Sequence, residues 1–166
     1  ICTAGTRAFV HDSIRDEFVA QVVEKAKSFK VGPGIDPTNQ MGPLVSAAQL
    51  ERVTNYIAQG QSEGAELLTG GKRIGDEGYF VEPTVFTNAK PGMKIVEEEI
   101  FGPVQTIQSF ADEDLEGIAR KANETIFGLS AYIWTQNLST AHKLAGLIKA
   151  GVVQVNAAAA PETALP

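Results

Sequence analysis

The sequence predicts an α/β protein, a three-layer domain with a mostly parallel sheet, and three observations carry that prediction. Helical and extended patterns alternate along the chain, as they do where helices cross between parallel strands. Among the 166 residues 43% are hydrophobic and 20% charged, which supplies a core and excludes a disordered chain. The single cysteine excludes a disulfide-stabilised scaffold, because a bridge needs two.

The charge balance excludes some classes of partner. The chain has 14 Lys and Arg residues against 20 Asp and Glu residues, a net charge of -6. Without a basic run to meet phosphates, no nucleic-acid partner is expected. No apolar stretch approaches the ~20 residues of a membrane span, and residues 1–12 do not resemble a signal peptide. We therefore expect no membrane partner and a cytoplasmic location.

The first elements are a strand and a long helix. Residues 7–11 (RAFVH) form a short apolar run with strand character. Ser13 is expected to begin a helix, with Asp16 three residues later completing a capping box. Apolar residues then recur at helical spacing until the Gly-Pro-Gly run at 32–34 ends the helix.

The middle of the chain predicts one more helix and two extended segments. The helix covers about residues 46–64, and residues 66–69 (ELLT) follow as a strand closed by two glycines. Residues 72–78 are polar and rich in turn formers, as in a hairpin-like loop. The extended segment 79–86 contains Pro83, which predicts an edge position because proline lacks the N–H of a central strand.

The last part of the chain alternates again. Residues 104–110 (VQTIQSF) predict a half-exposed strand, and a helix through residue 122 begins with acidic residues at 112–114. Residues 129–135 (LSAYIWT) predict a buried strand by their β-branched and aromatic content. A helix over 139–150 and a strand over 152–155 complete the pattern.

The sequence gives little support for a metal site or for a phosphate-binding loop. A structural zinc site needs four Cys or His ligands, and the chain offers only Cys2, His11 and His142, so no metal is expected. The run at 32–34 lacks the third glycine and the following helix of a dinucleotide fingerprint, so it is interpreted as a turn.

Two short segments carry chemistry. A lone cysteine such as Cys2 is more often inert than reactive unless a cation, a base or a helix N-terminus lowers its pKa. The three carboxylates at 97–99 repel one another, so at least one should be paired or act as an acceptor. Glu99 and Phe101 precede a Gly-Pro pair that would present an acid and a flat ring rigidly. A solvated turn before the strand at 104 is the alternative.

Both segments belong to a wider resemblance. Residues 1–7 (ICTAGTR) closely resemble the cysteine signature of the NAD(P)-dependent aldehyde dehydrogenase superfamily, and residues 98–103 (EEIFGP) resemble its second signature. Further matches follow in the family's order: Gly42-Pro43, Gly78-Tyr79-Phe80, Pro83-Thr84-Val85-Phe86, Asn123, Gly128-Leu129, Ala150-Gly151-Val152 and Val155-Asn156. The resemblance covers essentially the whole chain.

The resemblance implies a role for particular residues. Cys2 would be the nucleophile whose thiolate attacks an aldehyde, giving a thiohemiacetal, then a thioester that water hydrolyses, with its own N–H in the oxyanion hole. Glu99 would accept hydrogen bonds from the ribose of NAD or NADP, and Phe101 would pack beside the nicotinamide. Gln49 matches a position that also approaches the cofactor.

The same resemblance implies a substrate site. Ile1 and Thr3 flank the nucleophile, and Asn156 begins a loop that lines the substrate entrance in the family. The loop continues through small residues, which leave room for a bulky or aromatic aldehyde: Ala158, Ala159, Ala160 and Pro161. Residues 161–166 (PETALP) are similar to phenylacetaldehyde-type members.

The resemblance also implies an organisation. Residues 1–166 would be the catalytic domain, cut at both ends, with the cofactor-binding domain and the general-base glutamate outside the chain. Alone it should have negligible turnover, and the full-length protein should be a homo-oligomer. Two alternatives stay open: an acylating relative that transfers the acyl group to coenzyme A, and a non-catalytic module that keeps the fold.

Overall fold

The computed structural model describes residues 1–111 and 115–157, and contacts divide the chain into two compact units. The larger unit is Thr6–Asp112, and the smaller combines Ile1–Gly5 with Glu113–Pro166.

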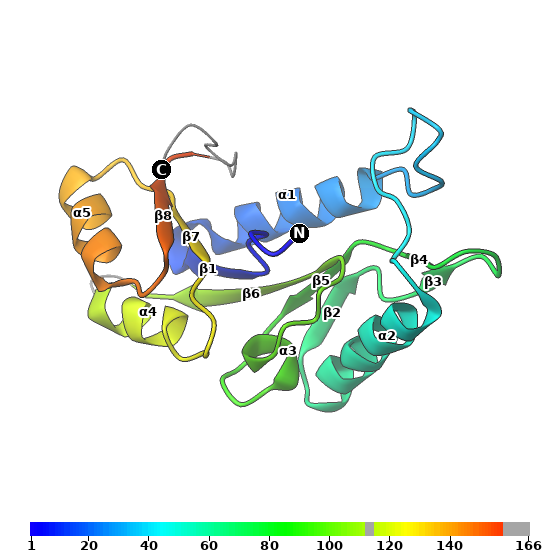
Figure 1. Ribbon diagram of the computed structural model, residues 1–166. Coiled ribbons are helices and arrows are strands. Elements are labelled where there is room, and N and C mark those ends of the chain that lie inside the picture. The colour runs from blue at the N-terminus through cyan, green and yellow to red at the C-terminus, as the bar shows by residue number, and fades with distance from the viewer. Residues whose placement is uncertain (112–114, 158–166) are drawn as a thin grey trace. The chain divides into compact units, whose positions relative to one another are not determined.

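The larger unit is built on a four-stranded sheet whose strands lie in the order β1-β6-β5-β2 (Figure 1). These strands are β1 (Arg7–His11), β6 (Val104–Phe110), β5 (Thr84–Thr87) and β2 (Glu66–Thr69). β6 runs parallel to β1 and to β5, whereas β2 pairs antiparallel with β5. The α/β class with a mostly parallel sheet is therefore confirmed.

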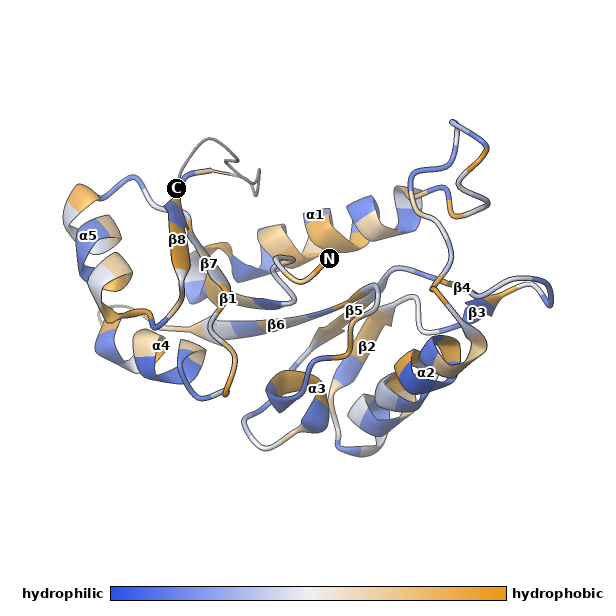
Figure 2. Ribbon diagram, in the orientation of Figure 1, coloured by the Kyte–Doolittle hydropathy of each residue, from blue (hydrophilic) through white to orange (hydrophobic). Residues whose placement is uncertain are grey.

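Helices cover both faces of this sheet. On β5, Val85 belongs to a core cluster with Ala26 of α1 (Arg15–Ser28), whereas the next residue, Phe86, packs with Val53 of α2 (Ala47–Ser62). Successive side chains of a strand point to opposite faces, so α1 lies on one face and α2 on the other, together with the short α3 (Lys94–Glu97). In Figure 2 the turns of α1 alternate between hydrophobic and hydrophilic colour, as expected of a helix with one buried face.

Of the two helix starts predicted at a serine, the one at Ser46 is confirmed and the one at Ser13 is not. Ser46 caps α2 as a hydroxyl should, with its Oγ accepting the Gln49 N–H at 3.2 Å. The capping box at Ser13 is wrong, because Asp12–Ile14 forms a short 3-10 turn, η1, and α1 begins at Arg15 without a side-chain cap. The Ser13 N–H instead donates to Nδ1 of His11 at 3.2 Å.

The positions predicted for the strands in the sheet need two corrections. β5 lies between β6 and β2 and all four of its residues are buried, so the edge position expected from Pro83 is wrong. Pro83 precedes the strand, where its missing N–H costs no ladder bond, and the Thr84 N–H donates to the Pro103 carbonyl at 2.8 Å. The half-exposed strand expected at 104–110 needs only a partial correction: Val104, Thr106 and Ile107 of β6 are buried, whereas Ser109 is exposed and the remaining residues are partly exposed.

The hairpin-like loop after β2 is confirmed. β3 (Arg73–Ile74) pairs antiparallel with β4 (Phe80–Val81). Gly70, which closes β2, has a φ of +76°, and a Cβ there would meet the Pro83 carbonyl, so only glycine fits the turn.

The smaller unit contains one pair of parallel strands and two helices in its described residues. They are β7 (Ser130–Ile133), β8 (Val152–Val155), α4 (Leu115–Ala122) and α5 (Leu138–Leu147). Asn123 ties the helices together, since its Nδ2 donates to the Leu147 carbonyl at 2.9 Å and its Oδ1 accepts the Lys149 N–H at 2.8 Å. Among the described residues the sheet of β7 has two strands, and Ile133 is the only residue of β7 that is buried, so the predicted burial of this strand is wrong at its other positions. The acidic helix start at 112–114 lies outside the described residues.

Candidate active site

Cys2 lies exposed in a tight turn at the start of the smaller unit. The Ala4 N–H donates to the Ile1 carbonyl at 3.2 Å and closes the turn. The Tyr132 hydroxyl on β7 donates to the Thr3 carbonyl at 2.8 Å and ties the turn to the strand. Within residues 1–111 and 115–157 the Cys2 thiol is in no disulfide and makes no hydrogen bond. The turn therefore presents an accessible thiol at a fixed place.

Asn156 follows β8 and extends its pairing with β7. Its N–H donates to the Ile133 carbonyl at 2.8 Å. Its side chain accepts the Thr135 N–H at 2.9 Å and donates to the Thr135 carbonyl at 2.8 Å, as a backbone partner would. Asn156 thus fixes the chain just before the predicted substrate loop. The loop residues Ala158, Ala159, Ala160 and Pro161 lie outside the described residues.

The acidic run is resolved into two bound carboxylates and one free one. Glu97 accepts the Gly92 N–H at 2.8 Å, and Glu98 accepts the Tyr56 hydroxyl at 2.5 Å. Glu99 is exposed, and its carboxylate has no hydrogen bond or ion pair in the part of the chain that the structure describes. The prediction that at least one carboxylate acts as an acceptor is confirmed, and Glu99 remains available to an external donor.

The backbone after Glu98 is held by α2. Arg52 Nη2 donates to the Glu99 carbonyl at 2.8 Å. Gln49 Nε2 donates to the carbonyls of Ile100 and Phe101 at 3.1 and 3.0 Å. The structure therefore brings Gln49 to the backbone of Ile100 and Phe101, the two residues after Glu99, and both bonds engage the donor nitrogen of Gln49.

Phe101 is presented in a strained conformation. Its φ is 54°, in the left-handed region that few non-glycine residues occupy, and the residue is 53% exposed. Glycine suits the next position, because a Cβ on Gly102 would lie 2.5 Å from Val53 Cγ2 and would force Val53 to shift. A well-supported backbone thus carries the exposed Phe101 two residues after the free carboxylate of Glu99.

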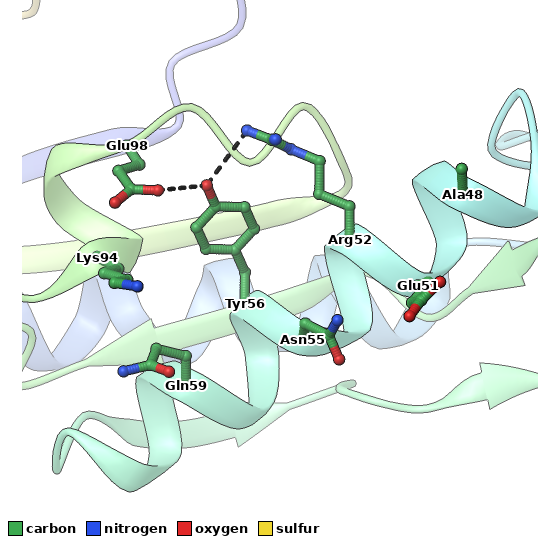
Figure 3. A pocket seen from close by; sticks show the side chains of 8 residues that line it. All are labelled: Ala48, Glu51, Arg52, Asn55, Tyr56, Gln59, Lys94 and Glu98. Atoms are coloured by element: carbon green, nitrogen blue, oxygen red, sulfur yellow. Dashed lines mark hydrogen bonds between the residues drawn. The ribbon is translucent and has the colours of Figure 1, made fainter.

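A shallow cavity of about 400 Å³ lies beside this segment (Figure 3). Its lining comes from α2, from α3 and from the residue after α3: Ala48, Glu51, Arg52, Asn55, Tyr56, Gln59, Lys94 and Glu98. Figure 3 shows Arg52 and Glu98 converging on the Tyr56 hydroxyl. The hydrogen bond to the Glu98 carboxylate raises the pKa of Tyr56, against the opposing charge of Arg52.

The described residues offer neither a metal site nor a membrane-spanning helix. Residues 1–111 and 115–157 contain no group of three His, Cys, Asp or Glu side chains placed to hold a metal ion. None of the helices in those ranges is long and apolar enough to cross a membrane.

Comparison with known proteins decides the family. The model of the aldehyde dehydrogenase family matches residues 1–166. The chain belongs to this family. An aldehyde dehydrogenase of Enchytraeus buchholzi is 49% identical over 156 residues, which are 94% of this chain and 31% of that protein. A betaine aldehyde dehydrogenase of Brucella anthropi is 47% identical over 161 residues, 95% of this chain and 33% of that protein.

Solved aldehyde dehydrogenases share the fold. The NAD+ complex of the Bacillus cereus enzyme has a TM-score of 0.95 and 44% identity, and the match covers 100% of this chain and 33% of that one. The Staphylococcus aureus betaine aldehyde dehydrogenase in complex with NAD+ has a TM-score of 0.90 and 35% identity, over 96% of this chain and 32% of that one. The chain thus spans about a third of the length of the relatives it matches.

Sequence reasoning missed three residues that hold these aldehyde dehydrogenase motifs in place: Arg52, Tyr56 and Tyr132. Arg52 and Tyr56 are four apart on a helix, and with Gln49 they share one face, so their spacing was a usable signal. Nothing local to β7 marks Tyr132 as a partner of residue 3.

Proposed function

We propose that the whole protein oxidises an aldehyde to the corresponding carboxylic acid, with Cys2 as the nucleophile and NAD+ or NADP+ as the oxidant. The observation that carries the proposal is the exposed Cys2 thiol on a turn tied to β7, in a chain that matches the aldehyde dehydrogenase family from end to end.

The proposed chemistry of Cys2 begins with its thiolate. The sulfur adds to the aldehyde carbon while the carbonyl π bond breaks and its electron pair moves to oxygen. The Cys2 N–H would donate to that developing oxyanion, stabilising charge that appears only during attack. When bound, the nicotinamide supplies the oxidant that removes hydride from the same carbon. The oxygen of water then bonds to the acyl carbon of the Cys2 thioester while the C–S bond breaks, so the carboxylic acid is released and a proton from the water regenerates the Cys2 thiol.

The cofactor role proposed for Glu99 and Phe101 fits the groups that the structure presents. A ribose diol offers two O–H donors and needs an acceptor, which the unpartnered Glu99 carboxylate supplies. An exposed ring on a strained, supported backbone can position a flat group through contact. Gln49 would act on the cofactor indirectly, by holding the Ile100 and Phe101 carbonyls. Two solved relatives are NAD+ complexes, which favours NAD+.

The proposed substrate loop begins after Asn156, which anchors it to Thr135. The small residues Ala158, Ala159 and Ala160 support an aldehyde with a bulky or aromatic group, and Ile1 and Thr3 would flank it. Relatives of comparable identity are named for betaine aldehyde, so a panel with both kinds of aldehyde tests this proposal.

Location and assembly are part of the same proposal. We propose the cytoplasm and a homo-oligomer. A relative from Leishmania tarentolae is named a mitochondrial aldehyde dehydrogenase, so fractionation of cells is the relevant test of location. Light scattering on the full-length protein tests assembly.

The experiment compares Cys2→Ala with Ile126→Ala in the full-length protein, following reduction of NAD+ or NADP+ by absorbance. Cys2→Ala should lower kcat by about a thousandfold or more, because a nucleophile has no substitute. Ile126→Ala is the control, since Ile126 is exposed in the same unit and belongs to no proposed site, and it should keep kcat within about twofold. Full activity of Cys2→Ala would refute the proposal.

A further inference from the structure

We propose that Arg52 and Tyr56 of α2 are positioning residues that hold residues 98–101 in the conformation that binds the cofactor. This inference rests on the cofactor role proposed above for Glu99 and Phe101. Neither residue lies in either signature of the family.

The two side chains form a continuous chain of hydrogen bonds. Arg52 Nη2 donates to the Tyr56 hydroxyl oxygen at 3.2 Å, and that hydroxyl donates to Glu98 Oε2 at 2.5 Å. The same Arg52 nitrogen donates to the Glu99 carbonyl at 2.8 Å. Two residues of α2 therefore bind both the side chain of Glu98 and the backbone carbonyl of Glu99.

The packing of Arg52 on the Tyr56 ring supports these hydrogen bonds. The guanidinium carbon lies 5.1 Å from the centre of the Tyr56 ring, within the range of a cation–π contact. A planar guanidinium can stack on the ring while its nitrogen donates to two oxygens, whereas a lysine ammonium cannot keep that geometry.

The segment needs such support. α3 is only four residues long and ends at Glu97, and Phe101 has a φ of 54°. A backbone in a sparsely populated conformation persists only when its surroundings determine it. Gln49 and the contact of Gly102 with Val53 fix the end of the segment, and Arg52 and Tyr56 fix its start.

A purely structural role is the competing explanation. In that case loss of the Tyr56 hydroxyl would lower stability without a selective effect on cofactor binding. The two explanations differ in the balance between the KM for NAD+ and the KM for the aldehyde.

The test uses Tyr56→Phe, Arg52→Lys and Arg52→Ala in the full-length protein, with Asn55→Ala as matched control. Asn55 lines the same cavity from the same helix and makes no hydrogen bond within the described residues. We expect Tyr56→Phe and Arg52→Ala to raise the KM and Kd for NAD+ by about fivefold or more, with the aldehyde KM unchanged. Arg52→Lys should restore only part of the loss.

A readout without cofactor completes the test. Amide hydrogen exchange of the peptide that covers residues 98–103 should be faster in Tyr56→Phe and Arg52→Ala than in Asn55→Ala. Unchanged exchange and an unchanged Kd for NAD+ in both variants would overturn the inference. A Glu99→Gln variant separates this failure from that of the proposed function. If Glu99→Gln weakens NAD+ binding and Tyr56→Phe does not, only the positioning role fails.

Discussion

The Tyr132 hydroxyl donates to the Thr3 carbonyl over 2.8 Å, and this bond joins two residues that are 129 positions apart. It ties the turn that carries Cys2 to a strand. The exposed thiol is therefore fixed in place, as efficient attack on a bound carbonyl requires.

Replacing Tyr132 with Phe should slow the reaction at Cys2. The Thr3 carbonyl loses its donor, so we expect a stability loss of about 0.5–1.5 kcal/mol and a several-fold lower kcat, with the KM for NAD+ unchanged. Thermal melts and initial rates measure both effects. Tyr79→Phe is the control, since the Tyr79 hydroxyl makes no hydrogen bond in residues 1–111 and 115–157. Equal kcat values in the two variants would contradict the tethering role.

Replacing Glu99 with Gln should weaken cofactor binding and leave the fold intact. The Glu99 side chain is exposed and unpartnered in the described chain, so the free energy of unfolding should not change. Loss of the charged acceptor should raise the KM for NAD+ by about tenfold. Glu51→Gln, another exposed carboxylate on the same unit, provides the comparison. A KM as low as that of Glu51→Gln would remove the role assigned to Glu99.

Adding a methyl group at Gly102 should destabilise the larger unit. The new Cβ would lie 2.5 Å from Val53 Cγ2, and Val53 is fully buried, so Gly102→Ala should cost about 1–3 kcal/mol in chemical denaturation. Val53→Ala in the same chain should recover part of that loss by making room. Gly42→Ala, where a Cβ meets nothing within 4 Å, should be close to neutral. A harmless Gly102→Ala would show that α2 can move away from the segment.

The Tyr56–Glu98 bond should have a pH signature. The pKa of the Tyr56 hydroxyl is raised above the ordinary 10.0, chiefly because the hydroxyl donates a hydrogen bond to the Glu98 carboxylate. The folded state therefore favours the protonated phenol. The bond's contribution to stability is therefore fully present below the ordinary pKa and is lost as the pH rises through the elevated value. A spectrophotometric titration, taken as the difference between wild type and Tyr56→Phe, measures that value. Glu98→Gln should bring the midpoint back toward the ordinary one, and an unchanged midpoint would contradict the stated cause.

Local patterns predicted most of the elements. The strands at 7–11, 66–69 and 152–155 have the predicted bounds, because each is a short apolar run between clear turns. The errors concern neighbours in space. Pro83 predicts an edge strand, but the strand begins only after it and has partners on both sides.

The candidate site also contains residues that local motifs indicate and contacts that only the folded chain creates. Short motifs in the sequence are enough to single out Cys2 and Glu99 as candidates. The sequence could not show that Glu98 would be bound and Glu99 left free, because that choice depends on Tyr56, 42 positions away. The donor nitrogen of Gln49, expected near the cofactor, is engaged by the carbonyls of Ile100 and Phe101, and only tertiary structure places these groups together.

The most direct test of the central claim is a search for the covalent intermediate. The full-length protein is mixed with NAD+ and an aldehyde, quenched during turnover, digested and examined by mass spectrometry. We expect an acyl group on the peptide that carries Cys2, and we expect it to be released as the free acid without any added coenzyme A. Full turnover with the acyl group on another residue, or with none on Cys2 at any quench time, would contradict the claim.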